Sequence, residues 1–240
     1  MKSLIGEQLN KNLFEFDSNI TADFIIGTDE AGRGPGAGGV FASAVHFPNP
    51  DDKLIEKLSL LNDSKKLSKK RREELYTIIL ANTINSTICI EVEEIEKINI
   101  LNASLKAMRL ACENVIREKG KREEEKEDAS RVELLTHWRE SDILLLVDGN
   151  KLIKDFTYPQ KFIIKGDSKS ASIAAASILA KVSRDKYMQE LHEKFPQYNW
   201  TQNAGYLTKE HIKAIEQFGV TPHHRESFLK NINAKQLSLY

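Results

Sequence analysis

The segment from Phe24 to Gly39 constrains the fold of this chain more than any other. Its first part, Phe24 to Thr28, is an apolar run typical of a β-strand, and it leads directly into the adjacent carboxylates Asp29 and Glu30. Two neighbouring negative charges would destabilise a core, so we expect them at the mouth of the strand, where they can bind a cation. Carboxylate oxygens favour a hard metal ion in that position.

A glycine-rich segment, Ala31 to Gly39, follows the two carboxylates and is called the glycine loop below. Because glycine lacks a Cβ atom, backbone N–H groups in such a loop can approach a ligand closely. Arg33 adds a fork of hydrogen-bond donors that suits a phosphate group. A metal site beside such a loop indicates phosphodiester chemistry; the alternative is a tight turn between two strands with an accidental acidic pair.

The same loop contains the spacing of a dinucleotide-binding fingerprint, G-x-G-x-x-G, at Gly34, Gly36 and Gly39. That fingerprint requires a helix directly after the glycines and an acidic residue about 20 positions later. Residues 40–47 are instead typical of a second strand, and Pro35 would break a helix. We therefore set dinucleotide binding aside.

Charge is balanced over the whole chain but not along it. The 240 residues include 35 Lys and Arg and 35 Asp and Glu, so the net charge gives no support for nucleic-acid binding. Residues 63–72, however, are mostly basic, and residues 151–186 also carry more bases than acids. This distribution allows a local basic face on a chain long enough for one large domain with a small appendage.

The cysteine pattern and the hydropathy bear on the cellular environment. Cys89 and Cys112 lie in apolar patterns without C-x-x-C spacing, which argues against a disulfide framework or a zinc site. The first residues lack the apolar core of a signal peptide, and no apolar run approaches the roughly 18 residues that span a bilayer. We expect a soluble, cytoplasmic and monomeric protein that does not associate with membranes.

The periodicity of apolar residues predicts an α/β fold with a mixed five-stranded sheet flanked by helices. We divide the chain into an N-terminal arm (1–22), a main domain (23–195) with a charged insert (117–140), and a C-terminal helical segment (196–240). The predicted strands are 24–28, 40–47, 86–92, 143–147 and 162–164. The predicted helices are a short one after Asp51 or Asp52, then 68–80 with Ser68 as N-cap, 98–116, a helix that begins at Ser170 or Ser172 and continues to 193, and 208–218.

Three of these apolar strands are followed closely by an aspartate: Asp29, Asp148 and Asp167. If the three strands run in the same direction, their carboxyl ends meet at one edge of the sheet, where open α/β sheets place their sites. Together with Glu30 they supply four oxygen donors with no His or Cys nearby, which favours Mg²⁺ or Mn²⁺. Two such ions about 3.5 to 4 Å apart can activate a water and stabilise the leaving oxygen of an in-line phosphoryl displacement.

Seven motifs, in order, resemble the motif series of the bacterial ribonuclease HII family, over about residues 24–228. They are DEAGRGP at Asp29–Pro35, NDSKKLS at Asn62–Ser68, VDGN at Val147–Asn150, KGDS at Lys165–Ser168, SIAAASILAK at Ser172–Lys181, GY at Gly205–Tyr206 and HRESF at His224–Phe228. The resemblance implies a ribonuclease H-like fold. It also implies an endoribonuclease that hydrolyses the RNA strand of RNA/DNA hybrids and cuts at single ribonucleotides in duplex DNA, leaving 3′-hydroxyl and 5′-phosphate ends.

The resemblance also implies roles for single residues. Asp29, Glu30, Asp148 and Asp167 become the metal-binding catalytic carboxylates, with Mn²⁺ or Mg²⁺ as cofactor. The loop at 32–34 would sense the ribose 2′-OH through its backbone, a lysine pair would contact phosphate, and a tyrosine would stack at the RNA-to-DNA junction. These substrate-binding residues are Gly32, Arg33, Gly34, Lys65, Lys66 and Tyr206. Two departures concern the loop, since the family often has a bulky residue at Gly36 and proline at Gly39.

Other polar or aromatic residues are interpreted as structural. Asp185 is expected to be ion-paired within a helix rather than a fifth ligand, and His223 and His224 to be structural or to face phosphate. Tyr187 and Trp200 are expected to pack in the interior.

Two other functions are compatible with parts of the sequence. A DNA nuclease of related fold, such as a junction resolvase, would share the acidic site without any need to sense a 2′-OH. A non-catalytic protein that binds hybrids is the other alternative, but four like charges kept together without a metal would be costly.

Overall fold

A computed structural model describes residues 13–61, 67–124 and 142–230 of the chain. Its centre is a mixed five-stranded sheet with the order β3-β2-β1-β4-β5. Strands β1 and β2, and β2 and β3, pair antiparallel, whereas β1, β4 and β5 run parallel. The strands are β1 (Phe24–Ala31), β2 (Val40–His46), β3 (Ile84–Ile90), β4 (Ile143–Asp148) and β5 (Gln160–Ile163). The predicted sheet, including the common direction of the three aspartate-bearing strands, is confirmed.

Strand β1 is longer than predicted, and this changes the surroundings of its carboxylates. Its pairing with β4 ends at Thr28, opposite Val147, but its pairing with β2 continues through Asp29 and Glu30. The prediction that the strand ends before the two carboxylates was therefore wrong. They lie inside a strand that is hydrogen-bonded on one side and open on the other.

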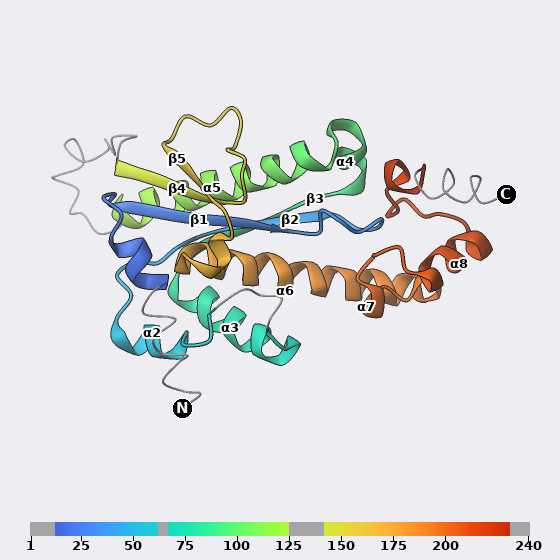
Figure 1. Cartoon of the computed structure of the whole chain (residues 1–240), viewed down its shortest axis with the longest axis horizontal. Coiled ribbons are helices and arrows are strands. Elements are labelled where there is room, and N and C mark those ends of the chain that lie inside the picture. The colour runs from blue at the N-terminus through green and yellow to red at the C-terminus, as the bar shows by residue number, and fades with distance from the viewer. Residues whose placement is uncertain (1–12, 62–66, 125–141, 231–240) are drawn as a thin grey trace.

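Helices cover both faces of the sheet (Figure 1). On one face lies α5 (Ile100–Glu124), preceded by α4 (Val92–Ile98); on the other lies α6 (Ala171–Lys194), with α3 (Lys69–Asn82) outside it. Each face has its own buried apolar cluster, one between the sheet and α5 and one between the sheet, α6 and α3. The chain is therefore a three-layer structure.

The closest approach between layers is that of α6 to β1. A Cβ atom on Gly27 would lie 2.2 Å from the backbone carbon of Ser172, so only glycine fits at this point of the strand. The small residues of the first turns of α6, Ala174 to Ala176, are fully buried. This close packing places the middle of α6 directly under the end of β1 that carries the carboxylates.

Side-chain caps fix where four helices begin. The short helix α2 (Asp52–Lys57) is capped by Asp51, α3 by Ser68 and α6 by Ser170, each through a bond from a backbone N–H to the side chain. Thr208 caps α8 (Lys209–Phe218) in the same way, and Gly219 ends it. These caps are among those expected from the sequence, because short polar side chains satisfy the free N–H groups of a first turn.

Other boundaries differ from the predictions. Strand β3 begins at Ile84, two residues early, and it also ends two residues early, at Ile90. The predicted helix 98–116 corresponds to α5, which begins at Ile100 after Asn99 (φ 66°), and the short helix α4 before it was not predicted. Helix α5 continues through residues 117–124, so the first part of the charged insert is a helical extension; the rest of the insert, with Trp138, lies outside the described residues.

The C-terminal segment forms a small apolar cluster beside the end of α6. A 3-10 turn η4 (Pro196–Tyr198) and a short helix α7 (Trp200–Asn203) precede α8. The indole of Trp200 is fully buried and stacks on Tyr198 with ring centroids 5.1 Å apart, while Tyr187 packs against Phe41, so both residues have the packing roles expected for them. In the described parts of the chain, no helix combines the length and apolarity needed to cross a bilayer.

The N-terminal arm is attached to α6 by a buried carboxylate. Residues 13–18 are helical, and Asp17 accepts hydrogen bonds from the backbone N–H (2.8 Å) and the hydroxyl (2.6 Å) of Ser172. Asp17 is 9% exposed. Its carboxylate thus acts as a second cap on the first turn of α6.

We predict that Asp17→Ala lowers the free energy of unfolding by about 1 to 2 kcal/mol, because it leaves a buried N–H and a buried hydroxyl without an acceptor. Urea unfolding followed by circular dichroism measures the loss. Asp23→Ala is the control, since Asp23 is exposed and should change stability by less than about 0.5 kcal/mol. Equal losses in the two variants would refute the capping role.

Candidate active site

Asp29, Glu30 and Asp148 come together at one end of the sheet. Asp29 and Glu30 are consecutive residues of β1, and Asp148 is the last residue of the parallel neighbour β4. Because β1 pairs with β4 only as far as Thr28, the two strands carry their carboxylates at the same open edge. Asp29 is buried at 7% exposure and Glu30 is half-buried.

The segment that carries the fourth predicted carboxylate, Asp167, is joined to this end of the sheet by a backbone hydrogen bond. Asp148 Oδ1 accepts a 2.6 Å hydrogen bond from the N–H of Gly166. Gly166 begins the 3-10 turn η3 (Gly166–Ser168) after β5, and Asp167 is its next residue. The contact therefore ties the segment that carries Asp167 to the end of β4.

The electrostatics of the site show mutual repulsion between carboxylates. Burial, followed by the charges of Glu30 and Asp148, raises the pKa of Asp29 well above its usual range. Burial also raises the pKa of Glu30, while the nearby Arg33 guanidinium acts in the opposite direction. A cation among these groups would relieve the repulsion, and the all-oxygen donor set suits a hard divalent ion. In the described residues, no three His, Cys, Asp or Glu side chains are close enough together to hold a metal ion as a group.

A residue of α6 fixes the most buried carboxylate. The hydroxyl of Ser177 hydrogen-bonds Asp29 and lowers its pKa, against the effect of burial. Ser177 is itself buried, at 6% exposure. The sequence placed Ser177 inside one of the family-like motifs, but only the packing of α6 under β1 assigns it this contact.

A cavity of about 70 Å³ opens beside Glu30 and Asp148. That volume accommodates several waters. Its lining includes the basic side chains of Arg33 and Lys151, and α5 contributes four residues, a contribution that the sequence did not reveal. The lining residues are Glu30, Arg33, Leu101, Ser104, Leu105, Met108, Asp148, Gly149, Asn150 and Lys151.

The glycine loop is held against the C-terminal segment. The N–H groups of Gly36 and Ala37 both donate to the carbonyl of Gly205, at 2.9 and 3.2 Å. A Cβ atom on Gly36 would lie 2.5 Å from Leu207, and one on Gly39 would lie 2.6 Å from Cys89 Sγ. Neighbouring side chains therefore fill the space at both positions where this sequence departs from the family pattern.

The predicted substrate-binding residues are partly assembled. Arg33 is exposed and donates a 3.1 Å hydrogen bond to Glu30, so it forms an ion pair with a carboxylate of the site. The ring of Tyr206 is 54% exposed and lies beside Gly34, where an added Cβ atom would be 3.3 Å from the ring. Lys65 and Lys66 fall in residues 62–66, outside the described residues.

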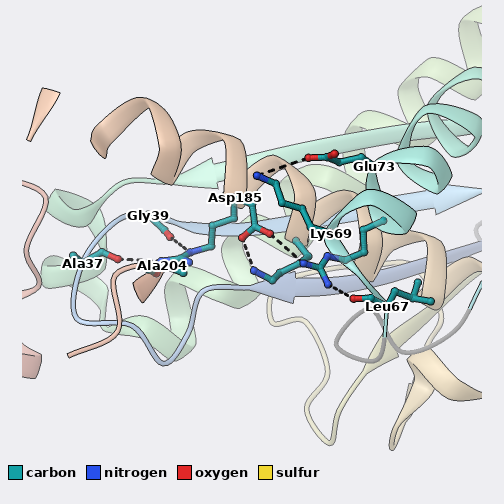
Figure 2. A network of polar contacts seen from close by, with 10 residues as sticks. Ala37, Gly39, Leu67, Lys69, Glu73, Asp185 and Ala204 are labelled. Atoms are coloured by element: carbon teal, nitrogen blue, oxygen red, sulfur yellow. Dashed lines mark hydrogen bonds and ion pairs between the residues drawn. The ribbon is translucent and has the colours of Figure 1, made fainter. Parts of the chain in front are cut away.

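Asp185 is not part of the acidic site. It forms ion pairs with Lys181 and, at 3.8 Å, with Arg72, as the sequence predicted for an ion-paired helix residue. Arg72 also donates to the carbonyl of Leu67 at 2.5 Å. Figure 2 shows Asp185 at the centre of this network, which joins α6 to the start of α3.

Two buried histidines, His211 and His224, lie next to the backbone of Tyr206. His211 Nδ1 lies 2.9 Å from the carbonyl oxygen of Tyr206, and its Nε2 lies 3.2 Å from Nε2 of His224. Trp200 Nε1 donates to the same His211 nitrogen at 3.0 Å. Burial, followed by the charge of His211, lowers the pKa of His224 to about 4, so His224 is neutral at pH 7. His224 is structural, as expected, and His211 is a supporting residue that the sequence did not indicate.

Comparison with known proteins gives a consistent result. A family model described as Ribonuclease HII matches residues 26–231. Ribonuclease HII of Rickettsia bellii (strain OSU 85-389) is 44% identical over 219 residues, which cover 91% of this chain and 96% of the relative. The expected resemblance is thereby confirmed over nearly the whole described chain.

Solved structures share the fold. The ribonuclease H2 from Pyrococcus horikoshii OT3 has a TM-score of 0.59 at 22% identity, covering 85% of this chain and 93% of that one. Bst-RNase HIII in complex with Mn²⁺ has a TM-score of 0.56 at 15% identity, covering 85% of this chain and 65% of that one. The expectation of a ribonuclease H-like sheet with a C-terminal helical segment is confirmed.

We predict that Asp29→Asn stabilises the protein when EDTA keeps it free of metal. A carboxyl whose folded pKa is raised contributes stability below its unfolded pKa, near 3.9, and that stability is lost as pH rises through the folded pKa. The wild type should therefore lose stability relative to Asp29→Asn between about pH 4 and neutral pH, because only the wild type must ionise a buried carboxyl that Glu30 and Asp148 repel. Urea unfolding at several pH values measures this difference.

Asp23→Asn serves as the matched control, since it makes the same chemical change at an exposed position. If Asp29→Asn and the wild type kept the same difference in stability at every pH, the account of repulsion at the site would be wrong.

Proposed function

Because the chain belongs to the ribonuclease HII family, we propose that Asp29, Glu30, Asp148 and Asp167 bind the divalent metal ions that its reaction requires. The activity follows from the family: the protein is a metal-dependent endoribonuclease that hydrolyses the RNA strand of RNA/DNA hybrids. The observation that carries the residue assignment is that Asp29, Glu30 and Asp148 come together at the ends of the paired strands β1 and β4. Burial and the charges of Glu30 and Asp148 raise the pKa of Asp29, which agrees with this grouping.

At least three of the four proposed ligands form a contact within the chain, Glu30 with Arg33 and two others as follows. Ser177 hydrogen-bonds Asp29, and the N–H of Gly166 donates to Asp148, so these two carboxylates are oriented by the chain itself. Bound Mg²⁺ or Mn²⁺ supplies an activated water and stabilises the leaving oxygen of an in-line displacement. That chemistry would leave 3′-hydroxyl and 5′-phosphate ends. One protein of similar fold, Bst-RNase HIII, was crystallised with Mn²⁺, which makes this ion a natural first choice for assays.

Arg33 lies where it can contact the substrate. Its side chain is 49% exposed and pairs with Glu30 at 3.1 Å, which places it beside the proposed metal ligands. Its planar fork of donors suits a phosphate group of the substrate. We therefore propose that Arg33 binds a phosphate next to the acidic site.

We also propose that the protein cuts at single ribonucleotides in duplex DNA. The backbone of Gly32 to Gly34 would bind the ribose 2′-OH, the group that distinguishes RNA from DNA, and the exposed ring of Tyr206 beside this loop would stack at the junction. Lys65 and Lys66 would contact phosphates. A DNA junction nuclease would need no such loop, and cleavage of a duplex with one ribonucleotide distinguishes the two. We expect the enzyme to act as a monomer, which sedimentation would test.

We predict that Asp148→Asn reduces cleavage by at least about 100-fold with Mg²⁺ or Mn²⁺ while the fold is retained. It removes a ligand charge at nearly constant volume, and even outer groups of metal sites typically contribute 10- to 100-fold. Cleavage of a labelled duplex with one ribonucleotide measures the effect. Asp155→Asn is the control, because Asp155 is an exposed loop residue whose φ of 53° asparagine tolerates. Near-normal turnover by Asp148→Asn would exclude the metal assignment.

We predict that Tyr206→Ala reduces cleavage at a single ribonucleotide by roughly 10-fold, because loss of base stacking costs on the order of 1 to 3 kcal/mol. A long RNA/DNA hybrid offers many binding registers and should be affected less. Tyr206→Phe keeps the ring and should remain near the wild type. Equal losses on both substrates would mean that Tyr206 is a general binding residue and not a junction sensor.

A further inference from the structure

Two buried arginines bind the glycine loop from elements that lie far away in the sequence. Arg184 belongs to α6 and is 2% exposed; Arg225 follows α8 and is fully buried. Neither side chain forms an ion pair with a carboxylate in the described parts of the chain. Their hydrogen bonds go instead to main-chain carbonyl groups, most of them in the loop.

Arg225 binds four carbonyl groups of the loop at once. Its Nε and Nη2 donate to the carbonyl of Gly38 at 2.9 and 2.7 Å, and Nη2 also donates to that of Gly32 at 2.8 Å. Its Nη1 donates to the carbonyls of Pro35 at 2.9 Å and Arg33 at 3.3 Å. One planar guanidinium therefore holds both ends of the loop. It can do so because its five N–H donors have a fixed geometry.

Arg184 completes the arrangement at the far end of the loop. It donates to the carbonyls of Ala37 at 3.0 Å and Gly39 at 3.3 Å, and to that of Ala204 at 3.0 Å. Figure 2 shows Ala37, Gly39 and Ala204 gathered around these bonds. A Cβ atom on Gly32, whose φ is 100°, would lie 2.2 Å from Arg184 Nε, so the side chain also packs against the start of the loop.

Burying two charged guanidinium groups lowers the stability of the folded protein unless other contacts offset the cost. Burial, followed by the charge of Arg184, lowers the pKa of Arg225 to about 9. Two cations buried close together repel each other, and the carbonyl dipoles of the loop offset that cost. A loop needed only to connect β1 and β2 could be shorter and would not need charged groups beneath it.

The consequence of this arrangement is the direction of the loop's N–H groups. In a trans peptide the carbonyl of one residue and the N–H of the next point in opposite directions, and the described residues contain no cis peptide. Since Arg225 binds the carbonyls of Gly32 and Arg33, the N–H groups of Arg33 and Gly34 point away from it. Both residues are exposed, and neither N–H has an acceptor within the described residues. The loop thus presents two free, fixed donors to a ligand.

We propose that Arg184 and Arg225 are positioning residues for recognition of the ribose: they hold the N–H groups of Arg33 and Gly34 where these can bind the substrate's 2′-OH. This inference rests on the function proposed above and adds the groups that give the loop its selectivity. Donors aligned in advance lose no conformational freedom on binding, so the preference for a ribonucleotide depends on the two arginines although neither touches substrate.

The test compares Arg184→Lys and Arg225→Lys with the wild type. Lysine keeps the charge but replaces the planar fork by one flexible ammonium, which cannot bind several carbonyls in fixed positions. Affinity is measured with EDTA present, so that no strand is cut, for a DNA duplex with one ribonucleotide and for the same duplex made only of DNA. We expect each variant to lose about tenfold of the wild-type preference for the ribonucleotide, equivalent to about 1.4 kcal/mol, and to bind the all-DNA duplex within about twofold of the wild type.

A control variant separates positioning from a general loss of stability. Ile79→Val removes a buried methyl group from the cluster between the sheet, α6 and α3, away from the loop, and should lower stability while the preference for the ribonucleotide stays unchanged. Arg184→Lys leaves all the bonds of Arg225 in place, so it is expected to fold even if Arg225→Lys does not. A folded arginine variant that keeps the full preference would overturn the inference.

Cleavage assays on the wild type separate a failure of the positioning role from a failure of the proposed function. If the wild type with Mg²⁺ or Mn²⁺ does not cut the single-ribonucleotide duplex, the proposed substrate is wrong, and the inference fails with it. If the wild type cuts and the lysine variants cut equally well, only the positioning role fails. The expected result is that kcat/KM for this substrate falls about tenfold in each lysine variant but not in Ile79→Val.

Discussion

The close packing of α6 against β1 is the contact on which the rest of the structure depends. It requires glycine at position 27, because the backbone of Ser172 occupies the place of a Cβ atom. From that point α6 runs beneath the sheet, and its residues reach the arm, the acidic site and the glycine loop in turn. The contacts are those of Ser172 with Asp17, Ser177 with Asp29, and Arg184 with the loop carbonyls. One helix thus positions groups that are far apart in the sequence.

Charge is distributed around the glycine loop in an unusual way. Buried carboxylates lie before it, at the end of β1, and buried guanidinium groups lie beneath it. The carboxylates repel each other and favour a cation, whereas the guanidinium groups are satisfied by main-chain carbonyls. Both arrangements cost stability in the ligand-free protein, and both keep a functional group in a fixed place, as is common where activity and stability compete.

The C-terminal segment belongs to the site as much as the sheet does. Its buried aromatic cluster fixes His211, which contacts the carbonyl of Tyr206, and its Arg225 binds the loop that lies beside the Tyr206 ring. The segment and the loop therefore form one structural unit. A ligand that contacts the loop and the tyrosine together meets a surface whose parts are held by the same buried residues.

The sequence by itself determined the five strands apart from their bounds and most helix caps, and it supplied the four carboxylates that we propose as metal ligands. These are local properties: period-two or helical apolar patterns predict elements, short polar side chains predict caps, and an aspartate after an apolar strand indicates a sheet edge. The ordered motifs added the family. The predicted ion pairing of Asp185 is also confirmed, although its partners are Lys181 and Arg72 and not the adjacent Arg184.

Only the tertiary structure decided that Asp29 and Glu30 lie inside β1, that Ser177 binds Asp29, and that two arginines 41 positions apart hold one loop. A strand's end depends on its neighbours: β2 continues beside the two carboxylates although β4 has stopped pairing. In the same way, an arginine is expected from sequence to lie at the surface, and only the packing of the folded chain buries it against carbonyl groups. Local patterns carry no information about such contacts, because their free energy arises from chain segments that meet only when the protein has folded.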